Sequence, residues 1–125
     1  MIYSTKDIKA RVCARKKQKQ FARLSFNSYG NMVCSISSVC TDLGGLTTRR
    51  AILQYDSDAN ILTVIPTLDT DRLTTVALSR TNTAKSGRIF SVTGFFNFVG
   101  IEPAPGRYLA KGTPDGVEIY LNAPL

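Results

Sequence analysis

The chain has 125 residues, 43% of them hydrophobic, and its 16 lysines and arginines outnumber 9 acidic residues to give a formal net charge of +7. This length suits one domain with a core of its own. No apolar run approaches the roughly 20 residues of a membrane helix, and the first residues lack the apolar segment of a secretory signal. We therefore expect a cytoplasmic protein with no membrane partner.

The charge is concentrated at the start of the chain. Residues 1–23 hold eight cations and one acid, so that 8 − 1 = 7, whereas residues 24–125 hold eight of each. A neutral body with a cationic extension differs from a uniformly basic protein. We predict a basic N-terminal arm over residues 1–21 and a single domain over residues 22–125.

The arm has the pattern of a short helix. Ser4-Thr5-Lys6-Asp7 has the spacing of a capping box, and residues 6–20 contain neither glycine nor proline. Ile8 and Val12 form a thin apolar stripe, and most other positions are polar. The sequence predicts a basic helix over Lys6–Gln20.

After the arm, the alternation of apolar and polar residues predicts strands, and serine and glycine mark a short helix. The expected elements are a strand over Phe21–Asn27, a strand over Met32–Ile36, a helix over Ser37–Leu43 closed by Gly44-Gly45, and a hairpin of Arg50–Tyr55 and Ile61–Ile65 ended by Pro66. The same order is expected again, as Thr75–Ser79, Arg88–Val92, a helix over Thr93–Val99 with Phe95, Phe96 and Val99 inward, Arg107–Lys111 and Val117–Leu121.

This order suggests an internal repeat. Val33–Pro66 lies on Ile89–Asn122 without a gap when it is moved by 89 − 33 = 56 positions. Neither half closes a core alone, but two halves around a pseudo-two-fold axis bury both apolar faces. We predict a mostly β fold with short helices: a small pseudo-two-fold barrel of two ββαββ repeats, 22–66 and 75–122, preceded by the basic helix.

Residues 24–36, with the turn Ser28-Tyr29-Gly30-Asn31, resemble the first hairpin of the AbrB/MazE/SpoVT family. Asp42-Leu43-Gly44-Gly45-Leu46 and Phe98-Val99-Gly100-Ile101 resemble the end of that family's helix, and Asn60–Ile65 resembles its last strand. Family members usually form homodimers with swapped hairpins and bind DNA. The resemblance implies such a dimer fused into one chain. The sequence departs from the family at Ser37 and Thr93, where a proline is expected, and neither short helix carries Arg or Lys.

The residues favour a protein that is not an enzyme. Histidine, the commonest general base and a frequent metal ligand, is absent from the sequence. Asp56-x-Asp58-x-Asn60 is interpreted as a tight turn rather than a calcium loop, and Cys34 and Cys40 as small buried apolar residues. We expect no metal site and no cofactor.

The basic residues are the functional candidates. Lysine and arginine on one extended element suit a phosphate backbone, because binding releases condensed counterions. The proposed nucleic-acid contacts are Lys6, Lys9, Arg11, Arg15, Lys16, Lys17, Lys19, Arg23, Arg49, Arg50, Lys85 and Arg88.

Two hypotheses about function follow from these residues. The first is a nucleic-acid-binding protein, such as a small DNA-binding transcription regulator, acting as a monomer or weak homo-oligomer. The second is a viral or structural/assembly protein, or an inhibitor, whose arm docks an acidic protein partner. If the protein is viral, we expect it in the nucleoid or the host cytoplasm.

Overall fold

Nine strands and two short helices form the part of the chain that the computed structural model describes, residues 20–80 and 87–125. The predicted arm helix lies outside these residues except for its last residue, Gln20. Lys85 also lies outside them. In chain order the elements are β1 (Phe21–Phe26), β2 (Met32–Ile36), α2 (Ser38–Leu43), β3 (Arg50–Asp56), β4 (Ile61–Thr67), β5 (Val76–Ala77), β6 (Ser79–Arg80), β7 (Arg88–Ser91), α3 (Thr93–Val99), β8 (Gly106–Thr113) and β9 (Gly116–Pro124).

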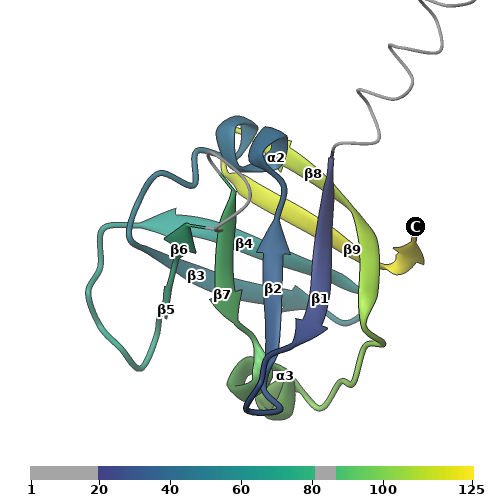
Figure 1. Ribbon diagram of the computed structural model, residues 1–125. Helices are drawn as coiled ribbons and strands as arrows, with labels where there is room; N and C mark the ends of the chain where they lie inside the picture. Colours follow the sequence, from purple (N-terminus) through teal and green to yellow (C-terminus); the bar gives the residue numbers. More distant parts are fainter. Residues whose placement is uncertain (1–19, 81–86) are drawn as a thin grey trace, which may run out of the picture.

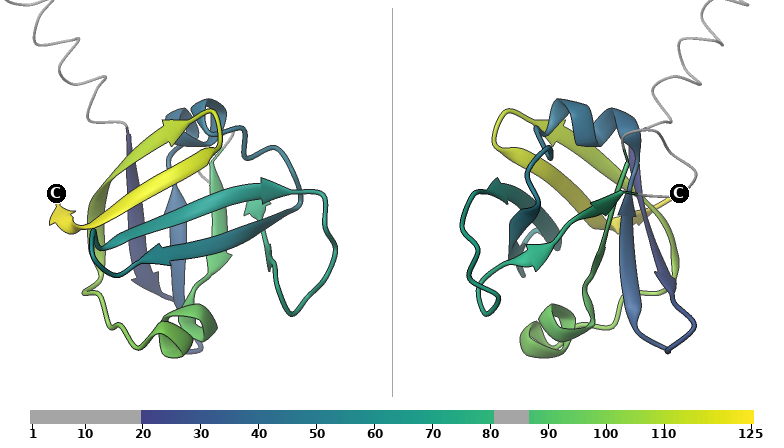
Figure 2. Two further views of the ribbon diagram at one scale, coloured as in Figure 1. Left: turned by 180° about the vertical axis from the view of Figure 1, so that it is seen from behind. Right: turned by 60° about the vertical axis from the view of Figure 1, so that its left-hand side comes forward.

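The strands form one antiparallel sheet in the order β5-β3-β4-β9-β8-β1-β2-β7-β6, and this sheet curls on itself (Figures 1 and 2). Its two ends meet in one segment, Val76–Arg80. β5 pairs with β3, β6 pairs with β7, and the N–H of Leu78 between them donates to the Arg49 carbonyl at 2.8 Å. Because β5 and β6 act as one kinked strand, the sheet is a nearly closed eight-stranded barrel.

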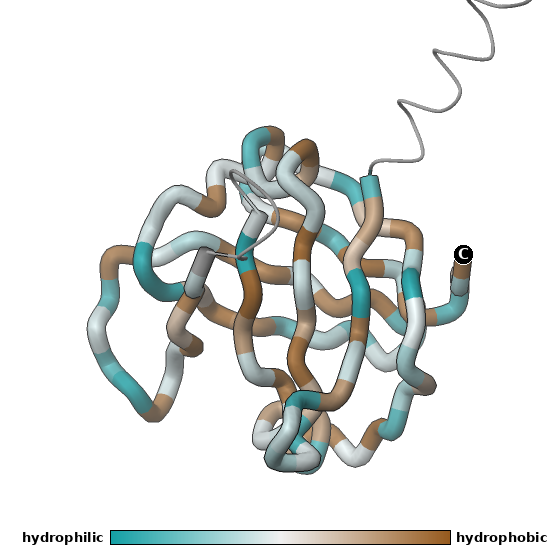
Figure 3. The backbone as a smooth tube through the Cα atoms, in the orientation of Figure 1, coloured by the Kyte–Doolittle hydropathy of each residue, from teal (hydrophilic) through white to brown (hydrophobic). Residues whose placement is uncertain are grey.

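The barrel interior is the hydrophobic core. Along β1, Ala22 and Leu24 are buried and Arg23 between them is exposed, as the period of two in a strand requires. The same alternation continues on the neighbouring strands, where apolar and polar positions follow one another along the tube of Figure 3. The largest fully buried side chains include Leu24, Ile36, Leu46, Leu62, Val64, Val92, Val117 and Ile119.

The two short helices begin and end where the sequence predicted. The Ser37 hydroxyl caps α2 by accepting from the Cys40 N–H, and α3 ends at Gly100 in the left-handed conformation, with φ 78°. In α3, Phe96 is buried and Phe95 packs against the core, whereas Val99 is only half-buried. Glycine at position 44 lets α2 approach the last hairpin, since a Cβ there would lie 2.5 Å from Val117 Cγ2.

One strand boundary differs from the prediction. Pro66 does not end β4, which continues to Thr67, and Pro66 pairs with Ala51 of β3. β9 pairs only with Ile61–Val64, so the proline lies where β4 has a partner on one side. A proline is tolerated there because its missing N–H is not needed by a second strand.

The gap-free shift of 56 positions is wrong in the second hairpin. It places the buried Ala51, Leu62 and Val64 on Arg107, Glu118 and Tyr120, which are exposed or half-buried. A slip of one residue along a strand moves every side chain to the other face of the sheet. The element order strand, strand, helix, strand, strand nevertheless occurs twice when β5 and β6 are taken together.

Candidate nucleic-acid interface

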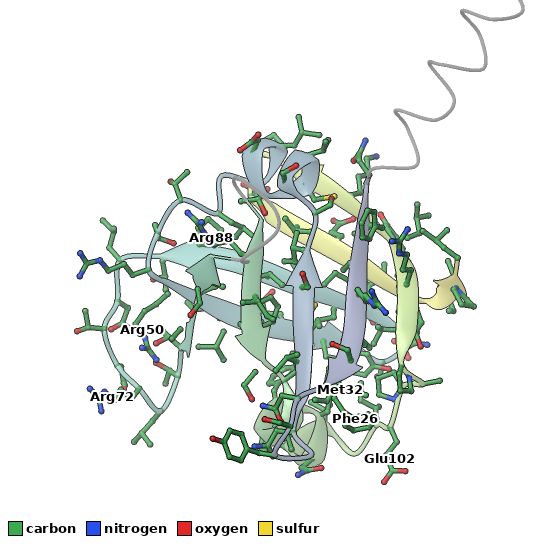
Figure 4. The ribbon with its side chains drawn as sticks, viewed as in Figure 1. Phe26, Met32, Arg50, Arg72, Arg88 and Glu102 are labelled. Atoms are coloured by element: carbon green, nitrogen blue, oxygen red, sulfur yellow. The ribbon has the colours of Figure 1, made fainter. Side chains whose placement is uncertain are left out.

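The structure describes four of the predicted contact residues, and they do not form one surface. Arg23 lies on β1, Arg50 begins β3 with Arg49 just before it, and Arg88 begins β7. The seven arm cations Lys6, Lys9, Arg11, Arg15, Lys16, Lys17 and Lys19 lie outside the described residues, as does Lys85. Three strands separate β1 from β3 in either direction around the barrel when β5 and β6 are taken together, so Arg23 and Arg50 occupy opposite walls. Figure 4 shows Arg50 on the side away from β1, whereas Arg88 lies on β7, which only β2 separates from β1.

Arg50 is held by hydrogen bonds within the protein. Its Nε donates to the Thr75 hydroxyl, and its Nη2 donates to the Thr75 carbonyl at 3.0 Å. The Thr75 hydroxyl in turn donates to the Asp71 carbonyl. This half-buried arginine therefore fastens the loop before β5 to β3, and its donors are used in the fold.

Arg88 also serves the fold. Its Nε donates to the Leu46 carbonyl at 2.9 Å, which ties the start of β7 to the turn after α2. Its Nη1 is buried without a hydrogen-bond partner among the described residues. A half-buried guanidinium anchored in this way presents little of its charge to a ligand.

Arg23 belongs to a cationic row that sequence reasoning did not find. The antiparallel register of β1 and β8 sets Arg23 directly opposite Arg107, and both side chains are exposed. On its other side Arg23 faces Ser35 of β2, so no carboxylate adjoins it in the row. Like charges directly opposite one another destabilise a sheet, and a bound anion removes that cost.

Arg107 is positioned by an aromatic ring rather than by acceptors. Its guanidinium carbon lies 4.6 Å from the centre of the Phe21 ring on β1. A cation–π contact of this kind is worth about 0.5–1 kcal/mol at an exposed site. It needs no hydrogen-bond acceptor, so the N–H donors of Arg107 are available to a phosphate.

Along β8 the outward positions after Arg107 are Leu109 and Lys111. Lys111 pairs in register with Glu118 of β9, so that end of the face is close to neutral. The Tyr120 hydroxyl donates to Glu118 Oε2 at 2.7 Å, and this hydrogen bond, with burial and the Glu118 charge, raises the pKa of Tyr120 above its usual value.

The remaining candidate groups have structural roles. Burial raises the pKa of the Cys34 thiol far above its usual range and also raises that of Cys40, so neither is a nucleophile at neutral pH. The turn interpretation of Asp56 is confirmed, since its Oδ1 accepts from the N–H groups of Asp58 and Ala59. Within residues 20–80 and 87–125, no cluster of three or more His, Cys, Asp or Glu could hold a metal ion.

None of the helices in the described ranges is both long and apolar enough to cross a bilayer. Sequence reasoning had the signal for Arg107, Leu109 and Lys111, because period-two alternation puts all three on one face, but it could not tell that β1 is their neighbour.

A scan of protein-family models and searches of curated proteins and of solved structures found no match to this chain.

Proposed function

We propose that this protein binds nucleic acid and is not an enzyme. The contacts are made to phosphates by the basic arm and by Arg23 and Arg107 on the outer face of β1 and β8. In the sequence the arm leads directly into β1, because Lys19 precedes Gln20 and Gln20 precedes β1. Arg49 and Arg50 lie on the other side of the barrel, and Arg88 is half-buried and bonded to the Leu46 carbonyl, so these three arginines are not part of the proposed interface.

The observation that carries the proposal is the Arg23–Arg107 pair. Two exposed arginines stand opposite one another on adjacent strands, at the start of the body and beside the segment that holds most of the net charge. A pair that costs stability is expected where function requires it. We propose that the two arginines of this pair and the cations of the arm contact the same ligand.

A mobility-shift series at rising salt tests the proposal. If the arm engages about five phosphates, the slope of log affinity against log salt is near −4 to −5. Deletion of residues 1–19 should flatten this slope, and Arg107→Ala should weaken binding more than Arg49→Ala. Absence of binding at low salt, or binding unchanged by the deletion, would contradict the proposal.

We also propose that residues 22–66 and 75–122 are copies of one unit related by a pseudo-two-fold axis, as the AbrB-like resemblance implies. The support is that strand registers match when each strand is shifted separately, with two residues added before β7, one added before β8 and two removed from the last turn. The matching pairs are Ala22↔Tyr108 with Val76↔Ala51, Ser25↔Val33 with Ser79↔Ile89, and Leu53↔Val64 with Ala110↔Ile119.

The β4–β9 ladder supports the same axis, since Leu62↔Ile119 becomes Val64↔Val117 when the two halves are exchanged. An experimental structure tests the duplication by superposition of the halves. The residues paired above should coincide, and a best superposition that pairs other residues would count against it.

A second candidate function, association of two copies of this chain, is favoured by a different surface. A hollow of about 610 Å³ lies between the loop before β5 and α3, and its lining includes Leu73, Phe95 and Phe98. Leu73 is 96% exposed and Phe98 is 86% exposed. The same loop carries Asp71 and Arg72, so two loops packed antiparallel bring opposite charges together.

Sedimentation velocity distinguishes this second candidate. A concentration-dependent dimer that Leu73→Asp abolishes, while Leu125→Asp does not, supports it. A monomer at all concentrations excludes it and leaves the nucleic-acid proposal untouched.

A further inference from the structure

The outer face of β1, β8 and β9 also carries an apolar row. The register sets Phe21 of β1 opposite Leu109 of β8, one step along the strands from the Arg23–Arg107 pair. Leu109 is 42% exposed. A leucine and a phenylalanine beside two exposed arginines are unusual on a surface that serves phosphate alone.

Beyond Leu109 the surface is hollowed. A pocket of about 240 Å³ is lined by Gln20, Leu109, Ala110, Lys111 and Tyr120. Leu109 and Ala110 give the pocket an apolar surface, Tyr120 gives it an aromatic ring, Gln20 a side-chain amide and Lys111 an ammonium group. The hydrogen bond from the Tyr120 hydroxyl to Glu118 Oε2 fixes the ring.

This combination matches an unpaired nucleobase better than a duplex. A duplex presents sugars and phosphates at its surface and keeps its bases stacked inside, so it leaves Leu109 and Tyr120 without a complementary surface. A single strand offers both a base, which stacks on an aromatic ring, and a phosphate, which binds arginine. Arg107 and Lys111 are four residues apart, which is about 13 Å along a strand and leaves room for a base between two cations.

The two ends of this face differ in charge. Arg23 and Arg107 have no acid between them, whereas Lys111 is opposed by Glu118. The phosphate is therefore drawn to the arginine end, and the base lies toward Tyr120, where the Gln20 amide reaches its edge.

We propose that the ligand is a single-stranded nucleic acid, with a base held in the pocket of Gln20, Leu109 and Tyr120 and the adjoining phosphate on Arg23 and Arg107. This inference rests on the proposed function and narrows it to one class of nucleic acid. It assigns roles to Leu109 and Tyr120, neither of which the distribution of charge along the sequence indicated.

Fluorescence anisotropy with the full chain tests the inference. The probes are labelled 12-nucleotide dT and U oligomers and a 12-base-pair DNA duplex at the same salt, so that the DNA and RNA arms are separate. Tyr120→Leu keeps the apolar area but removes the ring, and it should lower single-strand affinity about tenfold while leaving duplex affinity unchanged. Tyr120→Phe should stay within about twofold of the parent protein, because it keeps the ring.

Tyr29→Leu is the matched control, since Tyr29 is 87% exposed and lies in the turn at the far end of β1 from Gln20. It should bind both ligands as the parent does. Photo-crosslinking of 4-thiouridine in the U oligomer, mapped by mass spectrometry to Tyr120 or Gln20, reports the contact in the unaltered protein.

The outcomes separate the two proposals. Preference for a single strand, lost in Tyr120→Leu, supports the inference. Equal or stronger duplex binding, indifference to Tyr120→Leu, or crosslinks elsewhere overturn it and leave the nucleic-acid function standing. Binding of neither ligand at low salt overturns both.

Discussion

Two arginines on different walls of the barrel, with β4 and β9 between their strands, are held in contrasting ways. Arg107 on β8 lies over the Phe21 ring, and Arg50 on β3 donates two hydrogen bonds to Thr75. Under the proposed duplication, Arg107 of one half corresponds to Arg50 of the other, and Phe21 corresponds to Thr75. The neighbour decides the role, because an aromatic face leaves the guanidinium donors available and an acceptor uses them. Charge alone therefore does not identify a binding residue.

The largest effect is expected when the Arg107 wall is reversed in charge. Arg23→Glu/Arg107→Glu should lower nucleic-acid affinity on the order of 100-fold at low salt, because two phosphate contacts become repulsions. The matched control is Arg49→Glu/Arg72→Glu, with the same change in net charge at exposed arginines away from this face. Anisotropy titrations measure both, and equal losses would show that only net charge matters.

On the other wall, Arg50→Ala should act on folding instead of binding. Loss of charged hydrogen bonds to Thr75 should reduce the free energy of unfolding by about 1–3 kcal/mol. Arg107→Ala should change it by less than about 1 kcal/mol, because the lost cation–π contact is offset by relief from Arg23. Urea denaturation followed by circular dichroism compares them, and similar losses in both variants would contradict the contrast.

Phe21→Thr makes the Arg107 site resemble the Arg50 site. Without the ring, the guanidinium loses its platform, and affinity for nucleic acid should fall about threefold to tenfold. Phe26→Thr, at an exposed aromatic position on the far end of the same strand, serves as the control. Unchanged affinity in Phe21→Thr would mean that the ring does not position Arg107.

Arg23→Thr should show that binding and stability are opposed on this face. Removing one of two facing arginines and adding a good strand former should raise the free energy of unfolding by about 0.2–1 kcal/mol. The same substitution should weaken binding of nucleic acid. Thermal denaturation and titration of one preparation test both parts, and a drop in stability would argue against repulsion between the arginines.

The smallest effect concerns alkaline pH. The pKa of Tyr120 is raised in the folded state by its hydrogen bond to Glu118, so folding favours the neutral phenol. This stabilisation is present below the ordinary tyrosine pKa of about 10 and is lost as the pH rises through the folded value. Unfolding midpoints of the parent and of Tyr120→Phe should therefore converge at high pH, and parallel curves would contradict this linkage.

The local elements could be predicted because their causes are local. The serine cap and closing glycine of α2, the alternation along β1 and the Asp56 turn each lie within a few residues of the structure that they produce. The gap-free comparison of the two halves was wrong for the last hairpin. It places the buried Ala51 on the exposed Arg107, so it inverts the face of that strand.

The candidate interface could be predicted only in part. Arg23 and the arm follow from the distribution of charge, but the partner of Arg23 is 84 residues away, since 107 − 23 = 84. Such a pairing is decided when the whole sheet closes, and periodicity within one strand does not contain it. For the same reason, Arg50 and Arg88 were predicted as phosphate contacts, although their bonds to Thr75 and Leu46 give them structural roles.

The short segment that joins the two ends of the sheet has a consequence for the chain in a crowded solution. Val76–Arg80 covers the hydrogen-bonding edges of both β3 and β7, with two residue pairs on each side. These are the shortest ladders in the sheet, so transient opening should begin there. An opened seam uncovers two unpaired strand edges at once, and each can recruit a strand from a neighbouring molecule. The frequency with which Val76–Arg80 separates from β3 and β7 therefore sets the tendency of the protein to aggregate.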